Sequence, residues 1–322
     1  MRKVLITAAI ILLVLIVGGA IVENMVTRDK SSDARVPYLR GFVYNGYDNM
    51  LQFLDHMNGS NMIMAWYGDW NEGRSGGAAC AITEIAKQYN FTPLVIFQFF
   101  HQDNGQLLRP LDNANRENYR EIVENYVEKY NPRWLGLGIE VNLLYEKNPQ
   151  YFNEFVSFYN DVYDDVKAKS PETKIFTVFQ LEAIKSLSGL SGSHQQAWQL
   201  IDKFKLDAVG FTTYPELVFK KPSEIPDNYY AEIVLHTSKP ILFTEVAWAS
   251  KPLNAMWDAD TTENTQAEFV ARFFNLTKGF NKELVVWAFM HDLPDSFGVF
   301  KDMGLRTTDD TAKLAWDVWV GS

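Results

Sequence analysis

Eight short apolar segments recur along the chain, and longer amphipathic segments separate them. Each short segment is rich in Val, Ile or Phe and nearly free of charge, which is typical of parallel strands buried on both faces. The eight segments are Gly41–Val43, Met62–Trp66, Pro93–Phe99, Trp134–Glu140, Lys174–Phe179, Asp207–Thr212, Pro240–Glu245 and Leu284–Phe289. The pattern therefore predicts a parallel sheet whose two faces are both covered.

The longer segments between the strands carry helical periodicity. The clearest are Asn115–Lys129, Asn148–Ala168, Thr262–Leu276, with Thr262 as its N-cap, and Leu314–Val320. Eight strands that alternate with helices predict an α/β fold, a single (β/α)8 TIM barrel. A doubly wound open sheet is the alternative, but it would require a glycine-rich phosphate turn after the first strand. The glycines of 73–77 follow the second strand and do not form that motif.

The N-terminus has a composition of its own. Arg2 and Lys3 precede an uncharged apolar run over 4–22, which at 1.5 Å per residue is just long enough to cross a bilayer. Positive charge before the run places the N-terminus in the cytoplasm. We therefore expect a cytoplasmic basic end at 1–3, a transmembrane signal anchor at 4–22, a polar tether at 23–36 and the barrel at 37–322.

This arrangement predicts a single-pass protein of the cell membrane, with its barrel on the extracytoplasmic side. The small residues Gly18, Gly19 and Ala20 also suit a signal peptidase, so a secreted, cleaved form stays open. Cys80 is the only cysteine, which excludes an intramolecular disulfide and a cysteine-based metal site.

Composition narrows the class of partner. A net charge of -10 argues against nucleic acid as a ligand. Aromatic residues make up 14% of the chain and include nine tryptophans, which suit a ligand with apolar faces and polar edges, such as a carbohydrate. Nothing in the sequence implies an organic cofactor or an obligate protein partner.

Two of the predicted strands end on a glutamate. The fourth strand runs into Glu140 and the seventh into Glu245. In this type of barrel the reactive groups come from the C-terminal ends of the strands. Hydrolysis of a glycosidic bond uses two carboxyl groups, one to protonate the leaving oxygen and one to attack or to activate water. The two glutamates therefore predict a glycoside hydrolase.

The segment around Glu140, Gly138-Ile-Glu-Val-Asn142, resembles the Gly-Asn-Glu-x-Asn segment of clan A (4/7 superfamily) glycoside hydrolases, and most of all that of arabinogalactan endo-β-galactanase-like enzymes. The resemblance implies a retaining hydrolase of β-linked glycans, with Glu140 as acid/base and Glu245 as nucleophile. It also implies that Tyr214 contacts the nucleophile and that Trp287 lies under the bound sugar.

One position departs from the clan pattern. The residue before the acid/base is normally an Asn that contacts the sugar 2-hydroxyl, and here it is Ile139. Contacts of that kind strengthen in the transition state. The departure leaves open a different substrate, a compensating donor such as Asn142 or Gln180, or a lost activity.

Further polar and aromatic residues follow the predicted strands and are candidates for substrate binding. They are Trp66, Trp70, Gln98, His101, Asn142, Trp248 and His291. Glu182, just past the fifth strand, is a possible third acidic group. The pair His291-Asp292 invites a metal interpretation, but a metal site normally assembles three or four ligands. We therefore predict no metal site from the sequence.

Two alternatives to hydrolysis remain open. A catalytically silent barrel on the cell surface would bind a glycan or a protein without turnover, and Ile139 is the residue that favours it. A transglycosylase would use the same two glutamates and differ only in its products.

Overall fold

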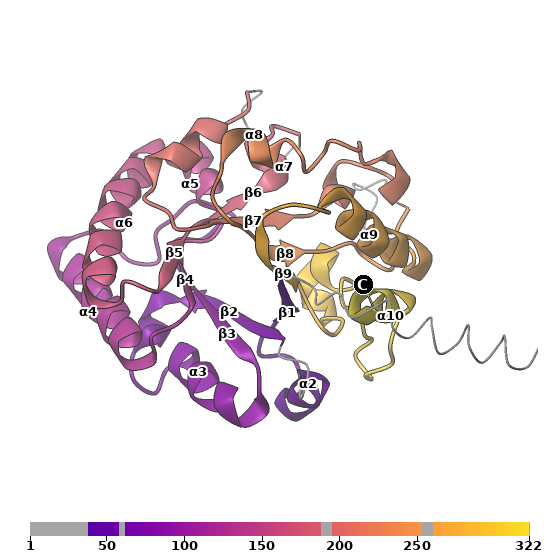
Figure 1. Cartoon of the computed structure of the whole chain (residues 1–322), viewed down its shortest axis with the longest axis horizontal. Coiled ribbons are helices and arrows are strands. Elements are labelled where there is room, and N and C mark those ends of the chain that lie inside the picture. Colours follow the sequence, from indigo (N-terminus) through magenta and orange to yellow (C-terminus); the bar gives the residue numbers. More distant parts are fainter. Residues whose placement is uncertain (1–37, 58–61, 188–194, 253–259, 322) are drawn as a thin grey trace, which may run out of the picture. The chain divides into compact units, whose positions relative to one another are not determined.

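The computed structural model describes residues 38–57, 62–187, 195–252 and 260–321, and Tyr38–Ser322 is one compact unit (Figure 1). All strands in these ranges belong to one parallel sheet. The strands are β1 (Leu39–Val43), β2 (Ile63–Asp69), β3 (Thr92–Gln98), β4 (Trp134–Leu137), β5 (Lys174–Phe176), β6 (Val178–Gln180), β7 (Val209–Thr213), β8 (Ile241–Val246) and β9 (Lys282–Trp287).

The sheet closes on itself. Its order is β5-β4-β3-β2-β1-β9-β8-β7-β6. In this order β1 and β9, which come first and last along the chain, are hydrogen-bonded neighbours. Only Thr177 separates β5, which pairs with β4, from β6, which pairs with β7. β5 and β6 are two parts of one interrupted strand. Counted in this way, the barrel has eight strands within the described part of the chain. The predicted (β/α)8 barrel is confirmed.

Helices surround the strands. They are α2 (Met50–Met57), α3 (Ala78–Tyr89), α4 (Asn113–Tyr130), α5 (Val141–Lys147), α6 (Pro149–Lys169), α7 (Leu181–Ile184), α8 (Ile233–His236), α9 (Glu263–Leu276) and α10 (Leu314–Gly321). Short 3₁₀ turns complete the connections, namely η1 (Trp70–Gly73), η2 (Trp198–Lys203), η3 (Pro215–Leu217), η4 (Pro222–Glu224) and η5 (Asp295–Phe300).

The four predicted helices are confirmed within two residues at each end. Thr262 caps α9 as expected, because its side chain accepts the backbone N–H of Thr265, and the Thr265 hydroxyl accepts the N–H of Thr262 in return. The reciprocal pair satisfies two of the free donors at the helix start.

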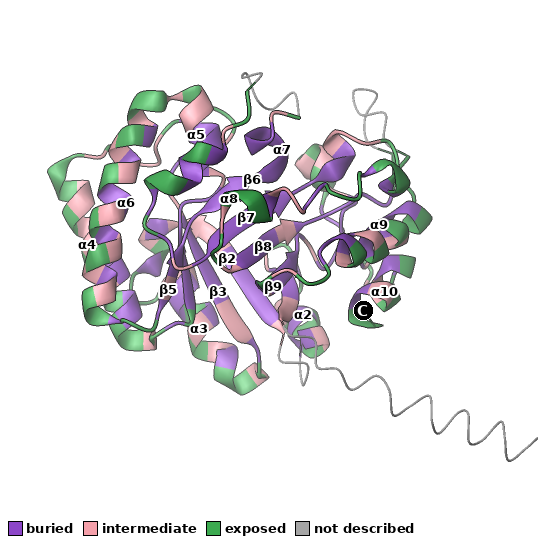
Figure 2. Cartoon of the chain, turned by 45° about the horizontal axis from the view of Figure 1, so that its top comes forward, coloured by how far each residue is buried: buried purple, intermediate pink, exposed green. Residues whose placement is uncertain are grey.

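Alternation along the strands builds two apolar layers. Figure 2 shows that the strands are mostly buried. One set of positions fills the barrel, and its buried members are Val43, Ile63, Ala65, Leu94, Ile96, Trp134, Ile139, Phe176, Val178, Ala208, Leu242, Leu284 and Val286. The residues between them face outward and join the larger cluster under the helices. Because a strand residue faces one layer or the other, this alternation decides which side chains can reach the barrel mouth.

In the described ranges, no helix is both long and apolar enough to cross a membrane. The predicted anchor over 4–22 lies outside these ranges, so the anchor and the location of the barrel stay predictions.

Candidate active site

A cavity of about 370 Å³ contains both glutamates that the sequence singled out. Its walls come from segments that follow β3, β4, β7 and β9 and from β8 itself. The lining residues are His101, Gln102, Asp103, Ile139, Glu140, Tyr214, Glu245, Phe289, Phe297 and Phe300. The cavity therefore opens at the C-terminal ends of the strands, where barrels of this type carry their reactive groups.

Glu140 is positioned by an unusual piece of backbone between β4 and α5. The strand ends at Leu137, Gly138 follows with φ +90°, and Glu140 itself has φ +53°. A Cβ atom at Gly138 would lie 2.8 Å from the Val141 side chain, so the turn requires glycine both for its φ angle and for space. The Glu140 carboxylate accepts a hydrogen bond from the Thr212 hydroxyl at 2.6 Å.

A β-bulge in β8 sets the direction of the Glu245 side chain. The register pairs Phe211 with Phe243 and then Thr212 with Glu245, which leaves Thr244 as an extra residue. Leu242 faces the interior, so strict alternation would turn Glu245 outward, beneath the helices. The extra residue reverses the alternation and aims Glu245 into the cavity, which is a known use of bulges beside active sites.

Two tyrosines hold this bulge and its glutamate. The Tyr67 hydroxyl donates to the carbonyl of Thr244, the extra residue. The Tyr214 hydroxyl donates to Oε2 of Glu245, the contact that the clan resemblance implies. The first hydrogen bond fixes the backbone of the bulge, and the second stabilises negative charge on the carboxylate.

Burial shifts the ionisation of the two glutamates. It raises the pKa of Glu140 to about 7, against the Thr212 hydrogen bond and with help from the charge of Glu182. Burial, followed by the Glu140 charge, raises the pKa of Glu245 to about 8. Since each charge opposes the other, the two protons leave in two steps that belong to the pair. The lower pKa lies on Glu140, whereas the hydrogen bond from the Tyr214 phenol favours negative charge on Glu245, so these two observations assign the single charge of the pair oppositely.

Glu182 is a third buried carboxylate, and it belongs to the scaffold of the site. It accepts hydrogen bonds from the Gln180 amide at 2.6 Å, the Thr213 hydroxyl at 2.7 Å, the Tyr229 hydroxyl at 2.8 Å and the backbone N–H of Tyr214 at 3.1 Å. Burial raises its pKa, and these donors oppose the shift. The network ties the end of β6 to the start of the Tyr214 segment, and so supports the residue that contacts Glu245.

The four tryptophans proposed to bind sugar do not line the cavity. Trp287 is 0% exposed, donates to the Met303 carbonyl at 2.8 Å and packs against the helices. Trp248 is equally buried and stacks on Phe269. Trp66 and Trp70 also belong to the cluster beneath the helices. The structure corrects this part of the predicted site, because outward strand positions and packed loops hold all four indoles.

The remaining candidates are distributed differently. His101 lines the cavity. Gln98 donates to Gln102 at 2.7 Å, just behind the lining. Asn142 is buried, and its amide exchanges two hydrogen bonds with the backbone of Gln180, so it cannot replace the missing sugar contact. His291 lies in a separate polar cluster after β9.

Sequence reasoning missed the aromatic wall of the cavity. Phe289, Phe297 and Phe300, from the segment after β9, line the cavity together with the polar residues His101, Gln102 and Asp103 from the segment after β3. The available signal was the concentration of Phe residues directly after the last strand. A wall of apolar rings together with hydrogen-bonding groups suits a sugar, whose ring faces are apolar and whose rim is hydroxylated.

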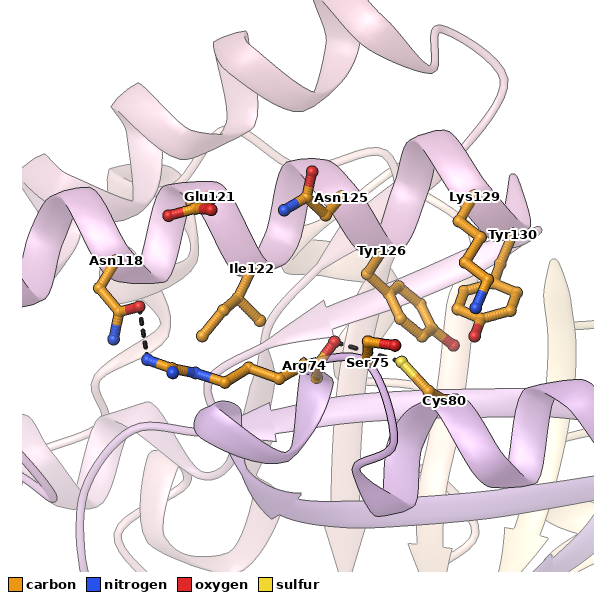
Figure 3. A pocket seen from close by; sticks show the side chains of 11 residues that line it. Arg74, Ser75, Cys80, Asn118, Glu121, Ile122, Asn125, Tyr126, Lys129 and Tyr130 are labelled. Atoms are coloured by element: carbon orange, nitrogen blue, oxygen red, sulfur yellow. Dashed lines mark hydrogen bonds between the residues drawn. The ribbon is translucent and has the colours of Figure 1, made fainter.

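A second cavity, of about 350 Å³, lies outside the barrel between the start of α3 and α4 (Figure 3). Arg74 donates to Asn118 across it at 2.7 Å, and Cys80 donates to the Gly73 carbonyl. The cavity contains neither glutamate of the pair and none of the barrel-mouth residues. It therefore takes no part in chemistry at the two carboxyl groups.

The strand order and the two glutamates define a (β/α)8 barrel with paired carboxyl groups in one cavity at its mouth. Among solved structures, the GH53 catalytic domain of Ignisphaera aggregans is similar with a TM-score of 0.63 and 15% identity, covering 89% of this chain and 97% of that one. Native xylanase 10B of Thermotoga maritima has a TM-score of 0.61 and 12% identity, covering 88% and 94%. A GH5_18 protein of Streptomyces cattleya, solved with Manb1-4GlcNAc, has a TM-score of 0.62 and 13% identity, covering 88% and 79%.

At these identities the likeness establishes the shared barrel fold. No family model matches the chain, and no curated protein matches it. The predicted barrel fold agrees with these neighbours, and the resemblance to clan A enzymes remains a prediction. The finer resemblance to endo-β-galactanase-like enzymes remains a prediction.

Proposed function

We propose that the protein is a retaining glycoside hydrolase that cleaves β-linked glycans with Glu245 as nucleophile and Glu140 as acid/base. The observation that carries the proposal is the convergence of the two carboxyl groups on one cavity, each aimed there by a local departure from regular backbone. The proposal includes the predicted membrane anchor, which would display the barrel outside the cell.

The proposed reaction has two steps. Glu245 attacks the anomeric carbon and forms a glycosyl-enzyme, while Glu140 gives its proton to the departing oxygen. Glu140 then removes a proton from water, which attacks the same carbon and releases the sugar with its original configuration. Tyr214 stabilises the charge on Glu245 before the attack. Both steps need only the two carboxyl groups and water.

Ile139 favours a second candidate, the silent binding barrel. Its side chain is 5% exposed, belongs to the interior cluster and contributes to the cavity floor. An apolar residue there offers no hydrogen bond to a sugar hydroxyl, and Asn142 is already occupied. This candidate predicts sugar binding without turnover.

The first experiment is a screen of the purified protein against β-linked polysaccharides and aryl glycosides, with the anomeric configuration of the first product followed by NMR. Hydrolysis with retained configuration supports the proposal, and inverted product contradicts the nucleophile role of Glu245. If glycans bind but none is cleaved, the silent barrel replaces the hydrolase. Oligosaccharides longer than the substrate would instead identify a transglycosylase.

The pH dependence of activity is a second prediction. With both carboxyls protonated there is no nucleophile, and with both ionised there is no acid, so only the singly ionised pair is active. Burial raises the pKa of Glu140 to about 7 and that of Glu245 to about 8, against about 4.3 for an exposed glutamate. We therefore expect kcat/KM to follow a bell with its maximum between about pH 7 and 8. A maximum near the ordinary glutamate value would contradict the buried, mutually opposed pair.

A further inference from the structure

Three side chains with metal-binding atoms meet on the side of the barrel where β1 pairs with β9. His56 comes from α2, His291 from the segment after β9, and Asp310 from the turn before α10. Nε2 of His56 lies 2.8 Å and Nε2 of His291 lies 3.0 Å from the same oxygen, Oδ1 of Asp310. One ligand atom from each residue lies within 4.8 Å of the other two.

Two further residues hold this group in place. Asp48 Oδ1 lies 2.9 Å from Nδ1 of His291, so that ring can present its Nε2 to the cluster in a fixed orientation. Asp48 is 9% exposed, and its second oxygen is buried and has no hydrogen-bond partner within the described part of the chain. Arg306 donates through Nε to Asp310 Oδ1 at 2.5 Å and through its guanidinium to the Asp310 carbonyl. A carboxylate behind a ligating histidine and a donor behind a ligating carboxylate are the usual outer partners of a metal site.

Three nitrogens point to Oδ1 of Asp310, one from each histidine and one from Arg306. The two imidazoles and the carboxylate, which come from three separate segments of the chain, therefore converge on one point, as the ligands of a shared cation do.

We propose that His56, His291 and Asp310 bind one divalent transition-metal ion of the zinc class. Two imidazoles and one carboxylate are ligands that Zn²⁺ favours, and three protein ligands leave a fourth position for water. The His56 side chain is 23% exposed, which gives the ion a route from solvent. The site joins α2 to the turn before α10, and so links the first and last units of the barrel.

The site is separate from the carboxylate cavity, since none of its three ligands lines that cavity. Its expected role is to stabilise the closure between β1 and β9. The proposal does not depend on the proposed hydrolysis, and its readouts are metal content, spectrum and stability.

The test uses the full chain, stripped with a chelator and titrated with zinc chloride and, separately, cobalt chloride. We expect one equivalent of zinc by calorimetry and by elemental mass spectrometry, visible absorption bands of four-coordinate cobalt, and a Tm that rises with free metal, as linkage requires. His56→Ala and His291→Ala should lose the bound equivalent, whereas His101→Ala, an exposed histidine outside the cluster, should keep it.

Asp48→Asn provides a variant that retains all three ligands. Loss of an outer partner weakens metal affinity by about 10–100-fold, so this variant should bind one equivalent more weakly. Failure of the unaltered chain to bind zinc or cobalt overturns the proposal. So does binding that survives in a folded His56→Ala or His291→Ala protein, or binding that His101→Ala abolishes.

Discussion

Glu245→Ala is expected to lower kcat on the order of 10⁴-fold or more, because losing the group that forms the covalent bond removes the whole first step. Added azide should restore turnover by occupying the vacated space and attacking the anomeric carbon directly. The glycosyl azide would then carry the inverted configuration, since one displacement replaces two. Steady-state kinetics with an aryl glycoside, followed by NMR of the product, measures both effects.

Glu216→Gln is the matched control for this variant. Glu216 is a buried carboxyl in the turn directly after Tyr214, and neither of its oxygens has a hydrogen-bond partner among the residues that the structure describes. Burial raises its pKa well above the usual range, the nearby Glu182 charge acts in the same direction, and glutamine keeps the size and shape of the side chain. Turnover should stay near that of the unaltered protein. Full activity in Glu245→Ala would remove Glu245 from the mechanism.

Glu182→Ala is expected to cost about 3 kcal/mol or more in the free energy of unfolding. The change leaves the Gln180 amide, the Thr213 hydroxyl, the Tyr229 hydroxyl and the Tyr214 N–H without their acceptor in a buried place. An unpaired buried donor costs about 1–3 kcal/mol, and water that enters the space left by the side chain offsets part of the sum. Urea unfolding followed by tryptophan fluorescence gives the value.

Glu182→Gln separates the hydrogen bonds from the charge. Glutamine keeps the size of the side chain and one acceptor oxygen, so it should unfold at a urea concentration between those of the unaltered protein and Glu182→Ala. Removing the charge also removes one contribution that raises the pKa of Glu140. The pH profile should therefore move to lower pH. Equal stability of Glu182→Ala and the unaltered protein would show that the network contributes nothing to the fold.

The barrel was predictable from sequence because its signals are local and repeated. Eight apolar segments reappear as strands, and the N-cap at Thr262 is a short motif that needs no distant partner. The interruption at Thr177 was not predictable, because Lys174–Phe179 reads as one continuous apolar segment. Its two halves differ only in which neighbouring strand each one pairs with.

Residues of the site were predictable only where their position at the end of a strand was sufficient to identify them. Glu140 and Glu245 end their strands, and both reach the cavity. The direction of Glu245 nevertheless depends on the bulge at Thr244, and no residue type in the sequence marks that bulge. Trp287 shows the opposite error, because the clan resemblance places it under the sugar, although alternation along the strand turns it outward.

The cluster around His291 was beyond sequence reasoning for a different reason. The sequence shows only His291-Asp292, and that aspartate contacts Lys313 instead. The partners of His291 are Asp48, 243 positions away in the chain, and Asp310. Only the closure of the barrel brings such distant positions together, so a search for short motifs finds one member of the set.

The pairing of β1 with β9 also dictates the order in which the molecule can be completed during synthesis. Leu39–Val43 leaves the ribosome first among the strands, and its partner Lys282–Trp287 leaves last. Throughout that interval the nascent sheet has an unpaired edge, whose free N–H and C=O groups can pair with other chains. The aromatic wall at Phe289, Phe297 and Phe300 is made later still. A chain that ends before the final strand therefore forms a barrel that is open along one side and lacks the aromatic wall of its cavity.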